Sequence, residues 1–193
     1  MVAAAHHEGA PVTDPVRVLL ISGSLRENST NTALLRLAGL AAPPDIATEL
    51  YEGMGGLPYF NPDADQPPFD PAVVELRAMI HSSDAILFST PEYAGGLPGS
   101  FKNLLDWTIG DEHADSIYRK PVAWVNTSAA PKGAADAHES LRIVLGYAHA
   151  RVVDEACSAI PVARQAVHDG LLADRSVRAS VVDTLQRLVA GIP

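Results

Sequence analysis

The stretch Val16-Arg17-Val18-Leu19-Leu20-Ile21-Ser22 is followed at once by Gly23-Ser24-Leu25-Arg26-Glu27-Asn28-Ser29-Thr30-Asn31. The first segment is short, rich in β-branched residues and almost continuously apolar, which predicts a strand covered on both faces, as in a parallel sheet. Residues 32–41 are rich in Ala and Leu and predict a helix, which the pair Pro43-Pro44 ends. A buried strand, a polar loop and a helix in this order indicate the first unit of an α/β fold.

The same alternation continues to the end of the chain. The further predicted strands cover residues 47–51, 84–90 and 121–126, and a fifth strand begins at 151–156. The predicted helices cover residues 71–83, 97–107, 134–148 and 174–190, and a proline-rich loop is expected between 53 and 71. Five strands alternating with helices predict a five-stranded parallel sheet between two helical layers, with strand order 2-1-3-4-5 and a Rossmann-like order as the alternative.

Composition narrows the class of protein. The chain has 193 residues, 47% of them hydrophobic and 19% charged, which suits a single compact domain over residues 16–193. Residues 1–15 lack a cationic start and a continuous apolar run, so they are expected to form a flexible leader rather than a signal peptide. The paired His6 and His7 in this leader lack further metal ligands at suitable spacing, so no metal site is expected.

Charge and cysteine content bear on partners and compartment. A formal net charge of −9 disfavours nucleic acid and anionic membrane surfaces as partners. No apolar run reaches the roughly 20 residues that cross a bilayer. Cys157 is the single cysteine, so no internal disulfide can form, and a reducing compartment such as the cytoplasm is expected.

The loop after the first strand has the composition of a phosphate site. Ser24, Ser29, Thr30 and Asn31 supply side-chain donors and Arg26 supplies a permanent planar cation. The loop opens a helix, whose unpaired backbone N–H groups favour an anion. A Walker loop is excluded because the lysine is missing, and a dinucleotide fingerprint because two glycines are missing. The alternative is a serine-rich loop that only caps its helix.

The loop after the third strand carries a longer motif. It reads Pro91-Glu92-Tyr93-Ala94-Gly95-Gly96-Leu97-Pro98-Gly99-Ser100-Phe101-Lys102-Asn103-Leu104-Leu105-Asp106-Trp107. This segment resembles the Pro-Glu-Tyr-x-x-x-x-Pro-Gly-x-x-Lys-Asn-x-x-Asp-Trp signature of NADPH-dependent FMN reductases, a family of flavodoxin-like fold. The first loop resembles the Gly-Ser-x-Arg-x-x-Ser-x-Asn phosphate motif of the same family, and the resemblance extends over residues 16–165.

The resemblance implies a set of FMN-binding positions. Ser24, Arg26, Ser29 and Asn31 match the residues that hold the FMN phosphate, and Thr30 is a further donor beside them. A second group matches the loop along the isoalloxazine ring. It consists of Pro91, Glu92, Tyr93, Ala94, Gly95 and Gly96. Many relatives have asparagine where this chain has Ala94, so a polar contact to the flavin is expected to be missing or supplied by backbone. Glu92 has an alternative interpretation as a loop brace or capping group.

The same resemblance bears on two further regions. The loop after the fourth strand is expected to contact the ring through Ser128 and Gly133, with Gly133-Ala134 in place of the family's paired glycine. Lys102, Asn103, Asp106 and Trp107 are expected to be structural. A homodimer or homotetramer is expected, formed through the helix that holds Trp107.

The resemblance also implies the chemistry. The chain is expected to be an oxidoreductase in which NADPH or NADH gives a hydride to bound FMN, and a free flavin, a quinone or a similar small acceptor takes the electrons. No catalytic side chain is required by this scheme. Two alternatives stay open: a flavodoxin-type electron carrier that binds FMN without oxidising NAD(P)H, and a sensor or scaffold without enzymatic activity on the same fold.

Overall fold

A computed structural model describes residues 14–109, 116–130 and 132–193 of the chain. All but the last two residues of the expected leader therefore lie outside the described residues. The central sheet contains β1 (Val16–Ser22), β2 (Ile46–Tyr51), β3 (Ala85–Ser89), β4 (Pro121–Asn126) and β5 (Arg151–Val152), all parallel. The strand order β2-β1-β3-β4-β5 confirms the flavodoxin-like order and rules out the Rossmann-like alternative.

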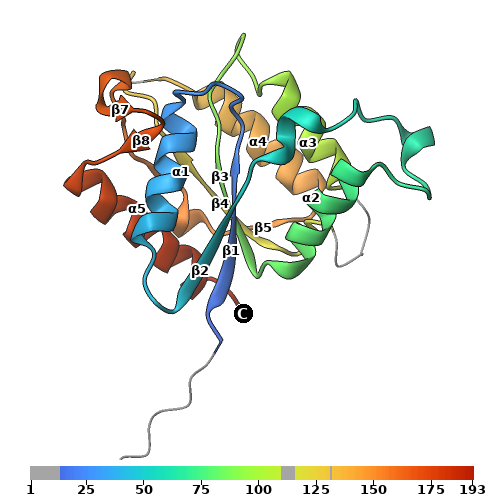
Figure 1. Ribbon diagram of the computed structural model, residues 1–193, viewed down its shortest axis with the longest axis horizontal. Helices are drawn as coiled ribbons and strands as arrows, with labels where there is room; N and C mark the ends of the chain where they lie inside the picture. The colour runs from blue at the N-terminus through green and yellow to red at the C-terminus, as the bar shows by residue number, and fades with distance from the viewer. Residues whose placement is uncertain (1–13, 110–115, 131) are drawn as a thin grey trace, which may run out of the picture.

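Helices cover both faces of the sheet (Figure 1). One face carries α1 (Thr30–Ala41) and α5 (Arg175–Ala190), and the other carries α2 (Pro71–Ser82), α3 (Gly99–Trp107) and α4 (Ala135–Tyr147). Alternate residues of β1 enter different cores: Val18 and Leu20 pack with α1 and α5, whereas Leu19 and Ile21 pack with the three other helices. The three-layer sandwich predicted from the apolar runs is confirmed. None of these helices has the length and apolar character needed to span a bilayer, as far as the described residues extend.

The fifth strand is shorter than predicted. Only Arg151–Val152 pairs with the start of β4, because the chain then turns through a 3-10 helix, η3 (Asp154–Ala156). It returns to the sheet as β6 (Ser158–Ala159), which pairs in parallel with the end of β4. The predicted strand over residues 151–156 is therefore wrong after Val152, and the edge of the sheet is made of two short pieces.

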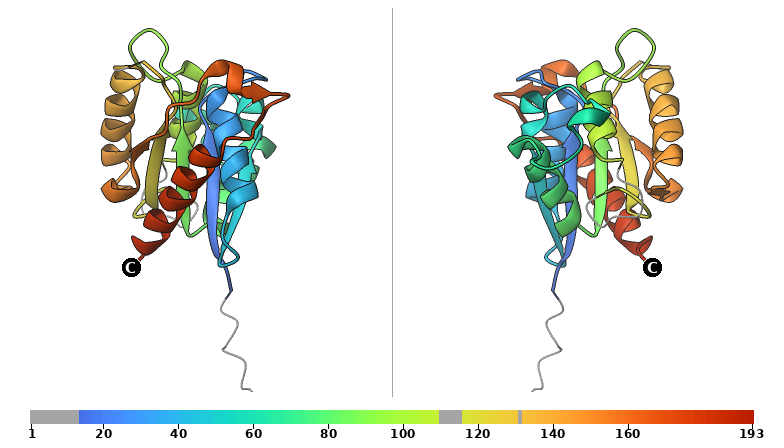
Figure 2. Two further views of the ribbon diagram at one scale, coloured as in Figure 1. Left: turned by 90° about the vertical axis from the view of Figure 1, so that its left-hand side faces the viewer. Right: turned by 90° about the vertical axis from the view of Figure 1, so that its right-hand side faces the viewer.

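Several short elements lie outside the predicted alternation. The proline-rich loop contains two 3-10 helices, η1 (Gly53–Gly56) and η2 (Pro62–Ala64). After β6 the chain forms η4 (Arg164–Ala166) and an antiparallel hairpin of β7 (Val167–His168) and β8 (Leu171–Leu172). The hairpin packs against α1 and brings the segment after β6 to the N-terminal end of that helix. Figure 2 shows this segment at the same end of the molecule as the loops that follow β1 and β3.

Candidate functional site

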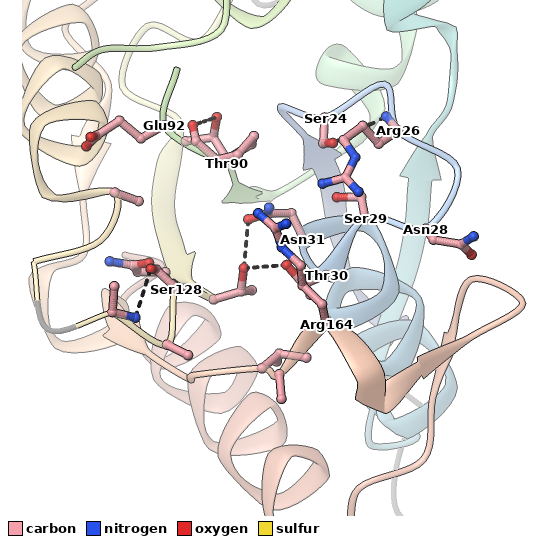
Figure 3. Close-up of a pocket in the computed structure, with 18 of the residues that line it drawn as sticks. Ser24, Arg26, Asn28, Ser29, Thr30, Asn31, Thr90, Glu92, Ser128 and Arg164 are labelled. Carbon is pink, nitrogen blue, oxygen red and sulfur yellow. Dashed lines mark hydrogen bonds between the residues drawn. The ribbon is translucent and has the colours of Figure 1, made fainter. Parts of the chain in front are cut away.

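A cavity of about 620 Å³ lies at the carboxyl ends of β1, β3 and β4, within the range of roughly 300–1,000 Å³ that ligand pockets occupy. This is the position at which open α/β sheets bind ligands, because the loops of the two halves of the sheet diverge there. The three loops at residues 22–31, 90–99 and 126–134 reach the cavity, and so does the segment 162–165 (Figure 3). Most of the cavity wall is polar.

The first loop holds its donors in place through bonds within the loop. Ser29 is the N-cap of α1, and its hydroxyl oxygen accepts from the backbone N–H of Thr32 at 3.4 Å. The hydroxyl oxygen of Ser24 accepts from the backbone N–H of Arg26 at 3.3 Å. In both cases the hydroxyl acts as acceptor and keeps its own proton for a ligand. The alternative interpretation, in which this loop only caps its helix, explains the hydrogen bond of Ser29. It does not explain why Ser24 and Arg26 line the cavity.

Asn31 is fixed by a buried hydrogen-bond network that joins α1 to the carboxyl ends of β3 and β4. Its side-chain oxygen accepts from the hydroxyl of Ser89 at 2.9 Å and from the hydroxyl of Thr127 at 3.1 Å. The Thr127 hydroxyl also lies 3.1 Å from the hydroxyl of Thr30. With its oxygen used by two hydroxyl donors, the amide group of Asn31 presents its nitrogen, a pure donor, as the group available to a ligand in the cavity it lines.

Glu92 joins the second loop to α4. Its carboxylate accepts from the backbone N–H groups of Asp136 and Ala137 at 3.0 and 3.2 Å, in the first turn of that helix. Figure 3 shows the side chain extended toward α4. A carboxylate at a helix N-terminus is stabilised by the unpaired N–H groups and by the helix dipole. The bracing and capping role is the one its contacts support, although the residue also lines the cavity.

The tip of the second loop is a two-residue hairpin turn. Tyr93 and Gly96 exchange backbone hydrogen bonds of 3.0 and 3.1 Å, and the two residues between them, Ala94 and Gly95, both have positive φ, at 51° and 72°. Positive φ at both central positions is the requirement of a type I′ turn, for which Asn-Gly is the preferred pair. The asparagine of many relatives therefore has a conformational explanation at this position, because Asn tolerates the left-handed region better than Ala.

We expect Ala94→Asn to raise the free energy of unfolding by about 1 kcal/mol, because the left-handed conformation costs alanine roughly 1–2 kcal/mol and asparagine less. Urea unfolding of the flavin-free protein measures this change. Ala94→Val is the matched control, and a β-branched residue at this φ is expected to lower the stability. A gain in FMN affinity without a gain in stability would instead support the missing polar contact.

The third loop is folded tightly around Ser128. The side-chain oxygen of Asn126 accepts from the backbone N–H of Ser128 at 2.9 Å, and its amide nitrogen donates to the carbonyl of Gly133 at 2.8 Å. A Cβ on Gly133 would lie only 1.7 Å from the Ser128 hydroxyl oxygen. The absence of a side chain at Gly133 thus lets the two ends of the loop pack against each other, while Ser128 lines the cavity.

A buried histidine lies below this loop. Nδ1 of His138 lies 2.5 Å from the carbonyl oxygen of Ala134, which can only accept, so this ring nitrogen donates, and the ring stacks on Trp124 with centroids 6.1 Å apart. Burial lowers its pKa below the ordinary value, although the Ala134 carbonyl and Glu92 act in the opposite direction. The ring is therefore expected to be neutral in the folded protein, and it packs at the base of α4 rather than in the cavity wall.

The second half of the long motif holds the proline-rich loop. The side chain of Asn103 accepts from the backbone N–H of Phe60 at 2.7 Å and donates to the carbonyl of Pro58 at 2.9 Å. The indole N–H of Trp107 donates to the same carbonyl at 2.8 Å. Lys102 and Asp106 form an ion pair of 2.5 Å across one turn of α3. These contacts support a structural role for the four motif residues, which stays a prediction.

The structure brings most of the predicted site residues together. The predicted residues that line the cavity are Ser24, Arg26, Ser29, Thr30, Asn31, Pro91, Glu92, Tyr93 and Ser128. The turn residues Ala94, Gly95 and Gly96 lie beyond its wall, and so does Gly133. The lining residues that sequence reasoning missed are Asn28, Thr90, Asn126, Thr127, Ala129, Ala130, Ala134, Val162, Ala163, Arg164 and Gln165. Among the described residues, no three His, Cys, Asp or Glu side chains form a group that could hold a metal ion.

Comparison with known proteins gives a consistent result. The sequence profile of the NADPH-dependent FMN reductases matches residues 16–165. An NAD(P)H-dependent FMN reductase of Pseudomonas aeruginosa is 35% identical over 178 residues, which covers 92% of this chain and 95% of the relative. A quinone reductase of Pseudomonas putida is 32% identical and covers 76% of this chain and 75% of its own. Among solved structures, the flavoenzyme NAD(P)H:(acceptor) oxidoreductase FerB of Paracoccus denitrificans superimposes with a TM-score of 0.74 at 29% identity, covering 91% of this chain and 98% of that one.

Proposed function

We propose, on the premise that the chain belongs to the family of NADPH-dependent FMN reductases, that the cavity at the carboxyl ends of β1, β3 and β4 binds FMN for an NAD(P)H oxidoreductase reaction. When bound, FMN supplies the redox chemistry, accepting a hydride from NADPH or NADH and passing electrons to a free flavin, a quinone or a similar small acceptor. The observation that carries the proposal is the group of hydroxyl, amide and guanidinium donors that lines the cavity beside the first turn of α1.

The donors fit the phosphate end of FMN. A phosphate monoester needs hydrogen-bond donors and positive charge, and the first loop offers the protons of the Ser24 and Ser29 hydroxyls, the amide of Asn31 and the guanidinium of Arg26. The exposed backbone N–H groups at the start of α1 add to these donors. These residues are proposed to hold and orient the phosphate, because their own bonds leave their donor groups available.

The end proposed for the ring is less polar. Pro91 and Tyr93 line one side, and Ser128, Ala129 and Ala130 line the other. Tyr93 is half exposed and offers an aromatic surface to a planar ring system. The residues on both sides are proposed to position the ring, and the open mouth of the cavity leaves room for the nicotinamide and then the acceptor, which proximity brings into reaction. No side chain is required as nucleophile or proton carrier.

An anaerobic absorbance titration tests the proposal. The protein, purified and loaded with FMN, is titrated with NADPH and separately with NADH. A reductase is expected to lose its oxidised flavin absorbance with one or both nucleotides. A protein that stays yellow would be an electron carrier, and one that neither retains FMN nor oxidises NADPH in the presence of FMN and a quinone would be a sensor or scaffold. Either result would overturn the proposed reaction.

We expect Arg26→Ala to weaken FMN binding by about 1.5–3 kcal/mol, because a hydrogen bond to a charged group contributes that much. Quenching of FMN fluorescence on binding measures the dissociation constant. Riboflavin, which has the same ring without the phosphate, serves as the control ligand, and its affinity is expected to be unchanged. Equal losses for both ligands would contradict a phosphate role for Arg26.

Compartment and assembly are also part of the proposal. A cytoplasmic location is supported by the single half-buried Cys157, whose thiol pKa is raised by burial and which is thus poorly reactive. A homodimer or homotetramer remains the expectation, and Tyr59, which is 93% exposed on the loop held by α3, is proposed to lie in the contact. The contact is proposed to form through the exposed face of the helix that holds Trp107, because the Trp107 side chain itself is 1% exposed. Light scattering at several concentrations tests the assembly.

A further inference from the structure

We propose that Arg164 is a second phosphate-binding residue of the FMN site, carried by a different segment from Arg26, and that the two arginines together select FMN against riboflavin. The inference rests on the proposed function, since it assigns a further residue to the same site. Arg164 lies in η4, more than a hundred residues from the phosphate loop along the chain, and belongs to neither sequence motif. Both arginines nevertheless line one cavity, and Figure 3 shows them on different segments beside the first turn of α1.

Neither arginine has a carboxylate partner among the residues that the structure describes. Four other arginines of the chain are ion-paired, at distances of 2.7–3.1 Å, and these are Arg36, Arg77, Arg142 and Arg187. A guanidinium is always charged and has five N–H donors in a planar fork that suits phosphate. Two such forks left without carboxylates in one cavity therefore provide a site for an anion.

The charge of the cavity wall supports this assignment. Glu92 is the one carboxylate among the described residues that line the cavity, and its charge is compensated by the N–H groups of Asp136 and Ala137 at the start of α4. The wall thus contains two guanidinium groups against one carboxylate that is already paired. This local excess of positive charge is found in a chain whose formal net charge is −9.

The backbone around Arg164 is held in position before any ligand arrives. The backbone N–H groups of Ile160 and Val162 donate to the carbonyls of Asn126 and Thr127 at 2.9 and 3.0 Å, so the segment runs along the extension of β4. Val162 is buried in the same core as α1 and α5. On the other side of Arg164, the hairpin of β7 and β8 packs against α1. A side chain carried by a fixed turn loses less conformational freedom on binding than one on a loose loop.

The chemistry that this pair recognises is a phosphate monoester. At neutral pH such a group carries most of two negative charges and three acceptor oxygens, enough for two guanidinium forks and the donors of the α1 turn. Two ligands of the proposed reaction carry such a group: FMN, at the end of its ribityl chain, and NADPH, at its 2′-position. The position beside the first turn of α1, where Arg26 and Asn31 also lie, favours the FMN phosphate. The experiment below distinguishes binding of the FMN phosphate from binding of the NADPH phosphate.

The test is a comparison of dissociation constants for FMN and riboflavin, measured by fluorescence quenching on the full-length protein and its variants. Arg164→Ala is expected to weaken FMN binding roughly 10- to 100-fold, the range for loss of a hydrogen bond to a charged group, and to leave riboflavin binding unchanged. Arg164→Lys is expected to lie between the wild type and Arg164→Ala, since it keeps the charge and loses the planar fork. Arg178→Ala removes the same charge from an exposed site on α5 and is expected to bind both ligands as the wild type does.

Three results would overturn the inference in distinguishable ways. If the wild type bound no FMN, the proposed function itself would fail. If Arg26→Ala weakened FMN binding and Arg164→Ala did not, the function would stand and the role of Arg164 would fall. If Arg164→Ala raised the KM for NADPH but not for NADH, with FMN affinity intact, Arg164 would belong to the nucleotide's 2′-phosphate instead. Unchanged thermal unfolding of the flavin-free variants is required for each comparison.

Discussion

Trp107→Ala is expected to lower the free energy of unfolding by about 3–5 kcal/mol, the usual cost of removing a large buried aromatic side chain. Trp107 is 1% exposed, and its ring meets that of Phe60 edge to face with centroids 5.0 Å apart. Its indole N–H also donates to the carbonyl of Pro58 at 2.8 Å. The substitution therefore opens a cavity in the core between α3 and the sheet and releases one of the bonds that hold the proline-rich loop.

The loop provides a second readout of the same change. Residues 57–61 are held to α3 by Trp107 and by Asn103, which keeps its own bond to the Pro58 carbonyl in the variant. We expect faster cleavage of this loop by a protease in Trp107→Ala, because fewer contacts oppose its local opening. Trp107→Phe is the matched control, since it keeps a ring and loses the hydrogen bond, at an expected cost of about 1–2 kcal/mol.

Urea unfolding measured on the flavin-free protein separates these effects. If Trp107→Ala cost no more than Trp107→Phe, the packing of the ring would contribute nothing and the interpretation of the motif as a loop anchor would be wrong. If the stability fell as expected while FMN affinity per folded molecule stayed the same, the motif residues on α3 would be confirmed as structural. Such a result would mean that a residue of the family signature need not contact the cofactor.

The layers and strand order followed directly from the sequence because each strand is a nearly continuous apolar run. A strand in the middle of a parallel sheet is covered on both faces, and residues such as Leu19, Leu20 and Ile21 are accordingly almost fully buried. Helix ends followed from local chemistry as well. Asp70 before Pro71 predicted the start of α2, and the Asp70 carboxylate accepts from the backbone N–H of Ala72 at 2.9 Å.

The edge of the sheet could not be predicted in the same way. A short edge strand contributes little apolar pattern, and the 3-10 turn at Asp154–Ala156 has no proline or glycine to announce it. The hairpin that follows did have a local signal. Asp169-Gly170 between Val167-His168 and Leu171-Leu172 is a typical two-residue hairpin turn, and both turn residues have positive φ in the structure, at 50° and 71°. That signal locates the turn but does not tell against which helix the hairpin packs.

The candidate site shows the same division between local and long-range information. Residues of the first loop were identified because their donors and the start of α1 are close together in sequence. The contacts of Glu92 with α4 and of Asn31 with Ser89 and Thr127 join segments 44 to 96 residues apart, and only the folded sheet brings them together. Arg164 was missed for this reason, since nothing beside it in the sequence resembles a phosphate motif.

Asn31→Asp is expected to weaken FMN binding by at least about 3 kcal/mol, that is more than a hundredfold, with the fold preserved. The substitution is nearly isosteric, and a carboxylate oxygen can accept from Ser89 and Thr127 as the amide oxygen does. It replaces the amide donor with an acceptor, however, and places a negative charge in the wall where the phosphate is proposed to bind. Two unit charges about 4 Å apart repel by about 4 kcal/mol at the effective dielectric constant of a protein surface.

Riboflavin distinguishes this repulsion from a general loss of the site. Its ring and ribityl chain are those of FMN without the charge, so Asn31→Asp is expected to reduce its affinity far less than that of FMN. Asn61→Asp makes the same chemical change at an exposed cap of η2, where the carboxylate can still accept from the backbone N–H of Asp63, and both affinities are expected to stay at wild-type values. FMN binding that survived Asn31→Asp would place the phosphate elsewhere in the cavity, because no dianion tolerates a new carboxylate at contact distance without loss of affinity.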